Sequence, residues 1–358
     1  FYVKYIENGF KKAFKGNWGE YEHTKKLGVL QDLNRLSYNS FRSHLRKVNL
    51  DIDSTSKIVG PHLLHGSQYG LLDPVDTPDG GNVGLHKHMS IMCKFSNYYS
   101  IKYLIDVILK LTTIHYLENC NYNMIDEKYK LFLNGLWIGM VDISNDIDSI
   151  YLKNEFIKLR RSGFIPYSIS FSLNLLDKQI FIYSDEGRLI RPLYYFIENK
   201  KKMKEISFSK LDSLEELKNS NWQQLINGYT FENESFNSID EFYKDEESFL
   251  KKSSVLEYLD SSELNMCYVS SQYKNLTNSH THMEIHPSLM FGIMGNQIIF
   301  PENNQLPRNL FGCGQAKQAV SLYHSNYIHR IDKMGVVLNY GQKPLIRTRY
   351  YNYLHNEE

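Results

Sequence analysis

The sequence predicts a multidomain protein of the mixed α+β class. Its 358 residues exceed the length of one ordinary domain, so about two to four domains are expected. Apolar residues at helical spacing alternate along the chain with short apolar runs that turn formers separate. The net charge is only +1, and the four cysteines lie far apart without a C-x-x-C pair. A zinc ribbon and a disulfide framework are therefore not indicated, and a reducing compartment fits.

Residues 1–15 are predicted to form a basic helix. Ile6, Phe10 and Phe14 recur at a spacing of four and mark one apolar face. The helix is expected to end before the turn GNWG at residues 16–19.

A second basic segment runs from Leu33 to Val48. Arg42 and Arg46 lie one helical turn apart, and Lys47 follows them. This spacing suits a phosphate-facing edge, and it suits a solvated basic face equally well.

Two acidic turns follow. Asp51 and Asp53 form a D-x-D pair, which fits a two-metal site or, more simply, an ordinary polar turn. DPVDTPDGG at residues 73–81 contains two prolines, which exclude a central strand.

The middle of the chain has mixed α/β texture. We expect a helix over YLIDVILKLTTIHYL, a hairpin turning at Asn134-Gly135, a helix over YLKNEFIKLRRSG with Gly163 after its end, and a strand-turn-strand over IFIYSDEGRLIRPLYYF. The bases of LRR at 159–161 are explained by the helix dipole. Residues 198–250 look like a lysine-rich, then acidic, surface insertion, and order returns at 255–270.

A run of histidines precedes the C-terminal part. His280, His282, Glu284 and His286 recur at a spacing of two and would share one face of a strand as far as Pro287. They suit a metal site or a polar face whose histidines bond to nearby backbone. In the apolar run that follows, Gly292 and Gly295 indicate close backbone approach.

Pro307 favours a helix start, and Arg308 lies just behind it. A helix N-terminus with a guanidinium suits a phosphate, although on the residues alone a structural carboxylate is the more common partner of such an arginine. In an unbroken helix Arg308 and Lys317 are nine residues apart, or about 14 Å of rise and half a turn, so they serve different partners.

Several motifs resemble one family in the same order along the chain. They are NRLSYNSFRSHLRKVN, PHLLH, DPVDTPDGGNVGL, EYLD, THMEIHPS, NNQLPRN, GQAKQA and YGQKPLIRTR. Together they resemble the second-largest subunit of multisubunit DNA-directed RNA polymerases, called β in bacteria, and the eukaryotic and archaeal form is the more similar. The resemblance implies a fork region at 1–96, an external 1 domain at 97–188, an external 2 domain with an acidic insertion at 189–278, and the start of a β-rich hybrid-binding domain at 279–358.

The resemblance also implies roles for single residues. Arg308 is expected to contact the phosphates of the incoming NTP, and Lys317 and Gln318 to face the RNA. Arg42, Arg46 and Lys47 would border the fork and bind nucleic acid. Asp76 would be a supporting carboxylate, and we expect it to pair with Arg308.

The function expected is that of a part of the catalytic-core subunit, which helps to bind template DNA, the RNA–DNA hybrid and NTP. Mg²⁺ would be bound mainly by the largest subunit, the principal partner beside other polymerase subunits. The chain is expected to be a piece of a larger subunit and inactive alone, working in the nucleus or, if viral, in the cytoplasm. An alternative is a stand-alone nucleic-acid-binding or polymerase-assembly protein without a catalytic site.

Overall fold

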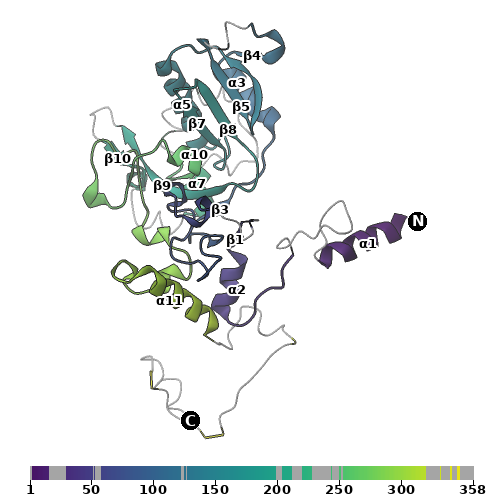
Figure 1. Cartoon of the computed structure of the whole chain (residues 1–358). Helices are drawn as coiled ribbons and strands as arrows, with labels where there is room; N and C mark the ends of the chain where they lie inside the picture. The colour runs from purple at the N-terminus through teal and green to yellow at the C-terminus, as the bar shows by residue number, and fades with distance from the viewer. Residues whose placement is uncertain are drawn as a thin grey trace.

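The computed structural model confirms the mixed α+β class (Figure 1). It describes residues 2–15, 30–50, 52, 58–121, 125, 127–198, 204–211, 220–227, 243, 250, 253–319, 331, 339, 340, 345 and 346. Over these residues the strands form sheets of two, six and five members. The bounds of the four expected domains stay a prediction.

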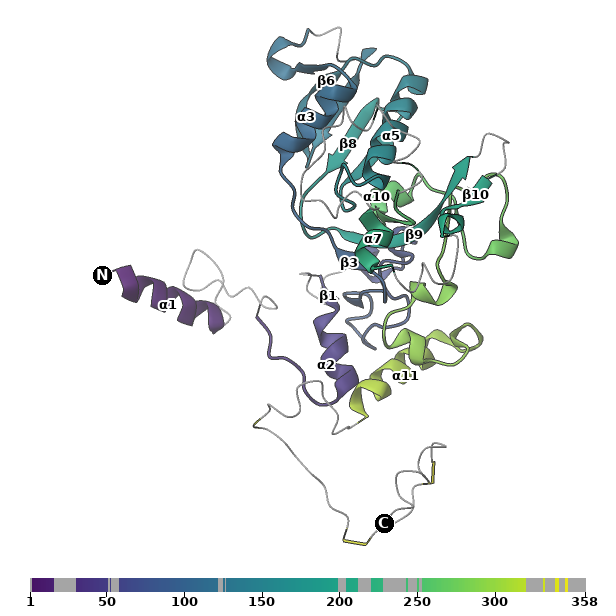
Figure 2. The ribbon, with the colours of Figure 1, turned by 180° about the vertical axis from the view of Figure 1, so that it is seen from behind.

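A five-stranded sheet with two helices forms one end of the molecule (Figures 1 and 2). Its strands, in spatial order, are β4 (Ile114–Tyr116), β6 (Leu136–Val141), β5 (Tyr129–Leu133), β8 (Gln179–Tyr183) and β7 (Ser170–Asn174), and its helices are α3 (Ile101–Leu111) and α5 (Asp146–Arg161). Leu104 of α3 and Phe156 of α5 are fully buried in one core with Tyr129 and Phe171 of the sheet. This apolar core holds the unit together.

Local signals place two of these elements correctly. The hairpin β5–β6 turns at Asn134 and Gly135, whose φ angles of 48° and 80° are those of a two-residue turn with left-handed residues. Helix α5 ends before Gly163, whose φ is 87°. The expected helix over 103–117 is too long, because α3 ends at Leu111 and Ile114–Tyr116 pairs with β6 as strand β4.

The long strand β9 (Leu189–Glu198) organises the six-stranded sheet. It pairs with β3 (Lys94–Phe95), β10 (Lys204–Ile206), β11 (Leu256–Asp260) and β13 (His282–Met283), and β13 pairs in turn with β12 (Val269–Ser270). The predicted strand-turn-strand is confirmed, but β8 and β9 belong to different sheets. Pro192 lies in β9 between the residues that pair with β3 and those that pair with β13, where the missing N–H is tolerated.

Part of the segment expected to be a surface insertion belongs to this sheet. Strand β10 extends β9, and Ser207, which follows it, is fully buried. Helix α7 (Trp222–Asn227) buries Ile226 against Ile190 and Tyr258. The prediction of a plain surface insertion is therefore wrong for these residues, whereas the lysine cluster at 200–202 lies outside the described residues.

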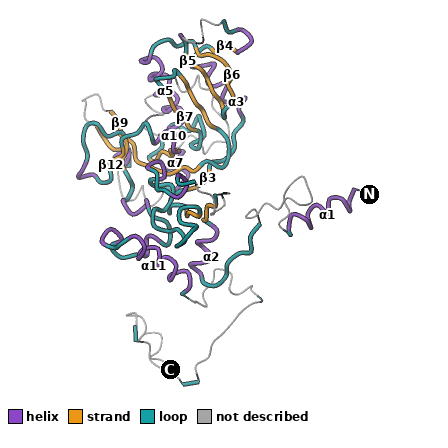
Figure 3. The backbone as a smooth tube through the Cα atoms, in the orientation of Figure 1, coloured by secondary structure: helices purple, strands orange, loops and turns teal. Residues whose placement is uncertain are grey.

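Loops dominate the region of the molecule that lies, in space, between the β9 sheet and α11 (Figure 3). The regular elements here are α2 (Tyr38–Leu45), β1 (Lys47–Asn49), β2 (His86–His88) and α11 (Leu306–Gln318). Short helices complete the fold: α10 (Ser261–Leu264) and the 3₁₀ turns η1 (Gly60–His62), η2 (Gly66–Gln68), η3 (Leu117–Asn119), η4 (Ser207–Lys210), η6 (Tyr273–Asn275), η7 (Pro287–Met290), η8 (Gly295–Gln297) and η9 (Pro301–Asn303). As expected from its prolines, the segment 73–81 contains no strand.

Asp73 fastens this region to the segment after the histidine run. Its buried carboxylate accepts hydrogen bonds from the backbone N–H groups of Val75, Gly292 and Gly295 at 3.0, 2.8 and 3.3 Å. A Cβ atom on Gly295 would lie 2.6 Å from Asp73 Oδ2, and one on Gly292 would lie 2.9 Å from it. The predicted close backbone approach at both glycines is confirmed.

The predicted N-terminal helix is also present, as α1 (Tyr2–Phe14). Its apolar face is open, since Ile6, Phe10 and Phe14 are each more than half exposed. The turn at residues 16–19 lies outside the described residues.

Candidate nucleic-acid interface

Helices α2 and α11 come together at their ends, although about 270 residues separate them (Figure 1). Ser37 caps α2 by accepting from the N–H of Ser40 at 3.1 Å, and its own hydroxyl donates to the carbonyl of Lys317 at 2.6 Å. Asn39 and Gln297 also exchange side-chain hydrogen bonds. The start of α2 is thereby fixed to the last turn of α11.

A cavity of about 760 Å³ opens beside this junction. Its lining combines the fork-like segments with α11: Asp32, Asn34, Leu36, Ser40, Ser43, His44, Lys47, Asp76, Thr77, Pro78, Asp79, His88, Leu310, Phe311, Gly314, Gln315, Lys317 and Gln318. Four of the seven residues predicted for the site, Lys47, Asp76, Lys317 and Gln318, therefore face one space.

Asp76 is the buried centre of this cavity wall. Its carboxylate accepts from Lys317 Nζ at 2.7 Å through Oδ1, and Oδ2 lies 3.2 Å from His88 Nδ1. The same His88 nitrogen lies 2.9 Å from the carbonyl oxygen of Asp76, so Nδ1 carries the proton. The arrangement holds a lysine ammonium, about one-quarter exposed, at the edge of the cavity.

His88 and Lys47 are neighbours across the β1–β2 pair. Burial lowers the pKa of His88 despite the opposing effect of Asp76, so the imidazole is neutral. Burial and the charge of Lys317 together lower the pKa of Lys47. Lys47 and Lys317 thus line the same cavity, where Lys317 alone forms an ion pair with Asp76, while Asp32 and Asp79 are exposed at its rim.

Arg308 does not belong to this cavity. It is exposed in the first turn of α11, with its guanidinium 5.7 Å from the centre of the Phe311 ring. No ion pair joins it to Asp76 among the described residues, and the expected Asp76–Arg308 pairing is wrong because Lys317 takes that carboxylate. The helix is unbroken from Leu306 to Gln318, so the spacing expected between Arg308 and Lys317 is present, and their different partners stay a prediction.

The three basic residues expected at the fork differ in kind. Arg42 is exposed and Lys47 faces the cavity, as described. Arg46 instead donates through Nη2 to the carbonyl oxygens of Ser90, Ile91 and Cys93 at 2.5, 3.3 and 3.2 Å. Its guanidinium closes the loop before β3 and so carries a structural role that the sequence did not reveal.

The histidine run does not assemble a common site. Glu284 pairs with Arg191 at 2.7 Å, His282 lies 3.4 Å from Glu257, His286 caps η7, and His280 bonds to Thr277. The strand is only two residues long, which is why the four side chains diverge. Within the described part of the chain, no three His, Cys, Asp or Glu side chains are grouped as metal ligands.

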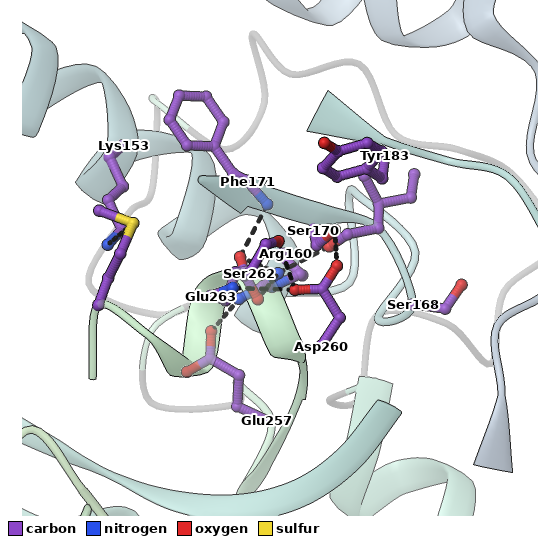
Figure 4. Close-up of polar contacts among 12 residues, drawn as sticks. Lys153, Arg160, Ser168, Ser170, Phe171, Tyr183, Glu257, Asp260, Ser262 and Glu263 are labelled. Carbon is purple, nitrogen blue, oxygen red and sulfur yellow. Dashed lines mark hydrogen bonds and ion pairs between the residues drawn. The ribbon is translucent and has the colours of Figure 1, made fainter. Parts of the chain in front are cut away.

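The sequence reasoning missed a buried ion network centred on Arg160 (Figure 4). Arg160 donates to Glu263 at 2.8 Å, to Glu257 at 2.5 Å and to the carbonyl of Ile169 at 2.7 Å. Arg161 also pairs with Glu257, at 2.7 Å. The expectation that LRR serves only the helix dipole is therefore wrong. The available signal was the three acidic residues within the apolar run VLEYLDSSEL, since a charge in a buried segment requires a partner.

Some predicted features lie outside the described residues. They are Asp51, Asp53 and most of the motif YGQKPLIRTR at residues 340–349. In the described part, no helix has the length and apolar character needed to cross a membrane.

Comparison with known proteins gives the same assignment along the whole chain. Three family models match in order: RNA polymerase Rpb2, domain 3, at residues 31–95, domain 4 at 131–196, and domain 6 at 294–358. The chain is 31% identical over 366 residues to the DNA-directed RNA polymerase II subunit 2 of Arabidopsis thaliana, covering 99% of this chain and 28% of that protein.

Two other relatives agree with this. The RPB2 subunit of RNA polymerase II from Encephalitozoon cuniculi is 32% identical over 366 residues, covering 99% of this chain and 29% of that protein. The DNA-directed RNA polymerase subunit 2 of Acanthamoeba polyphaga mimivirus is 31% identical over 360 residues, covering 97% of this chain and 29% of that protein. The chain spans less than a third of each of these relatives.

The class of protein is accordingly that of the large core subunits of multisubunit DNA-directed RNA polymerases. Within it, the chain belongs to the Rpb2 family, that of the second-largest subunit. The resemblance seen in the motifs is confirmed.

Proposed function

We propose that this chain forms part of the catalytic core of a DNA-directed RNA polymerase and helps to bind template DNA, the RNA–DNA hybrid and the incoming NTP. The observation that carries the proposal is the contact between Asp76 and Lys317, which closes the fork-like segment onto α11 around one open cavity. Family membership supports the same function, because the matched segments follow the order of the Rpb2 domains.

In this proposal Lys317 and Gln318 face the RNA. An ammonium group has three N–H donors, and Asp76 accepts one of them, so two are left for phosphate or ribose oxygens. Lys47 adds a second cation on the same wall, and Arg42 offers an exposed guanidinium on α2. Contacts of this kind to the sugar-phosphate backbone fix position without reading sequence.

Arg308 takes a different part, as the contact to the NTP phosphates. It is exposed at the N-terminal end of a 13-residue helix, where the helix dipole and the guanidinium both attract negative charge. It lies about half a turn from Lys317 around the helix and does not line the cavity. One helix therefore offers its first turn to the nucleotide and its last turn to the transcript.

Nucleotidyl transfer itself is a phosphoryl-transfer reaction in which positioning and charge stabilisation account for most of the catalysis. We propose that Mg²⁺ is held mainly by the largest subunit, the direct partner of this chain in the assembled enzyme beside other polymerase subunits. The enzyme would work in the nucleus or, for a viral protein, in a cytoplasmic factory.

The test is a primer-extension assay with the assembled polymerase carrying Arg308→Ala. We expect nucleotide addition to slow by about 10²- to 10³-fold, because a charge-assisted contact to the transferring phosphate is lost. Arg308→Lys keeps the charge and should recover part of the rate, whereas Lys274→Ala, at an exposed lysine of η6, should have no effect. Unchanged elongation by the polymerase with Arg308→Ala would contradict the proposal. Purification of the chain from cells without the largest subunit bound to it would contradict it as well.

A further inference from the structure

A second cavity lies inside the part of the molecule that holds the Arg160 network. It has a volume of about 310 Å³ and shares no lining residue with the cavity between α2 and α11. One stripe of α5 forms a wall, since residues 153, 154, 157, 160 and 161 recur at helical spacing. Strand β11, helix α10 and the segment around β13 supply the other walls.

The charges that line this cavity do not balance. Lys153, Arg160 and Arg161 contribute three positive charges, and Glu257 and Glu263 contribute at most two negative ones. Both carboxylates are already paired with the two arginines. Burial lowers the pKa of His282, so this imidazole adds no charge. The ammonium of Lys153 is therefore the uncompensated charge of the cavity.

Two strong donors of the lining lack an oxygen acceptor within the described part of the chain. The Lys153 ammonium donates to the Met266 thioether sulfur at 3.8 Å, which is a weak acceptor. Arg160 Nε is buried and has no hydrogen-bond partner. Figure 4 shows Lys153 beside this sulfur and away from the carboxylates that surround Arg160. Arg160 Nε is shielded from the cavity, whereas the Lys153 ammonium is partly exposed and has only this weak acceptor, so it can donate to an oxygen ligand in the cavity.

We propose that this cavity is a binding site for a small oxyanion, a phosphate or a carboxylate, paired with Lys153. The volume equals that of about ten water molecules, which is enough for such an anion with its water or with a short organic group. Ile157, Leu259 and Phe196 offer apolar surface to an organic group. The cavity lies between α5, which packs on the five-stranded sheet, and strands of the six-stranded sheet. A bound anion would therefore connect α5 to the β9 sheet and stabilise the folded chain.

The experiment measures the thermal unfolding and calorimetric binding of the full chain with sodium phosphate, sodium acetate or sodium succinate, each against sodium chloride of equal ionic strength. We expect phosphate or a carboxylate to raise the unfolding temperature in a saturable manner. Whether phosphate or a carboxylate binds more tightly shows which of the two oxyanions the cavity prefers. Lys153→Met, which keeps a long side chain without charge, should weaken binding about tenfold or more.

Lys274→Met is the matched control, because it removes the same charge from an exposed lysine that does not line the cavity. It should bind as the unchanged chain does. Lys153→Arg should retain binding and shows that loss in Lys153→Met is not a folding defect. Equal weakening by Lys153→Met and Lys274→Met, or no response to any of the anions beyond that to chloride, would overturn the proposal.

Discussion

Replacing Arg160 by methionine tests the buried network most directly. The side chain is 2% exposed, and the substitution removes its ion pairs with Glu257 and Glu263 and its bond to the Ile169 carbonyl. Glu257 keeps Arg161 and His282 as partners, whereas Glu263 loses its cation. Breaking a buried pair from one side costs about 3–5 kcal/mol of unfolding free energy, and we expect that range above neutral pH.

The pH dependence of this cost has a definite sign. Burial, with Asp260 and Glu257 nearby, raises the pKa of Glu263 from 4.5 to about 7 even beside Arg160. Stability from this group is therefore complete below its unfolded pKa and is lost as pH rises through about 7. Without Arg160 the folded pKa of Glu263 is higher still, so between about pH 8 and pH 6 the variant gains more stability than the unchanged chain does. The cost of Arg160→Met should therefore fall as the pH is lowered over this interval.

The assay is urea unfolding of the full chain at both pH values, with circular dichroism as the measured signal. The double variant Arg160→Met with Glu263→Gln serves as the control, because it removes the orphaned charge together with its partner. It should recover part of the lost stability. A cost below about 1 kcal/mol at the higher pH, or no recovery in the double variant, would refute the assignment of the network as a charge-balanced unit.

Three further predictions concern the region around α11. Asp76→Asn should lower the free energy of unfolding by about 1–3 kcal/mol, because a buried carboxylate with two partners is neutralised; unchanged urea unfolding would argue against its central place. Gly295→Ala should cost about 1–3 kcal/mol, since its Cβ would lie 2.6 Å from Asp73, whereas Gly314→Ala, which meets open space, should not destabilise the chain. Arg46→Met should destabilise the fold yet leave the salt dependence of hybrid binding unchanged, because three carbonyls already use its guanidinium; a shallower slope of log affinity against log salt would contradict this.

Features set by neighbouring residues were predictable from the sequence. The Asn134-Gly135 turn and the end of α5 at Gly163 depend on local φ preferences, and both are where the sequence places them. The phase of Arg308 and Lys317 on one helix follows from 3.6 residues per turn. The ordered motifs were sufficient for the family because they extend over the chain rather than over one site.

Features that join distant segments were not predictable in this way. Asp76 and Lys317 are separated by 241 residues, and no local pattern shows that Lys317 rather than Arg308 reaches the carboxylate. The role of Arg46 depends on carbonyl groups of a loop that lies more than 40 residues further along the chain. The partners of Arg160 lie about 100 residues further along the chain. In each case tertiary packing decides which of several equally plausible partners a charged side chain takes.

Strand β9 has a consequence for the order in which the chain folds. It pairs with β3, about 95 residues earlier in the chain, and with β11 and β13, about 60 to 90 residues later. During synthesis, β9 must therefore leave the ribosome well before β11 and β13 exist to cover its edges. Contacts so distant along the chain form slowly, and an uncovered strand edge pairs readily with other chains. We expect this sheet to form last, and the interval before β13 emerges to be the time at which the nascent protein most needs a chaperone.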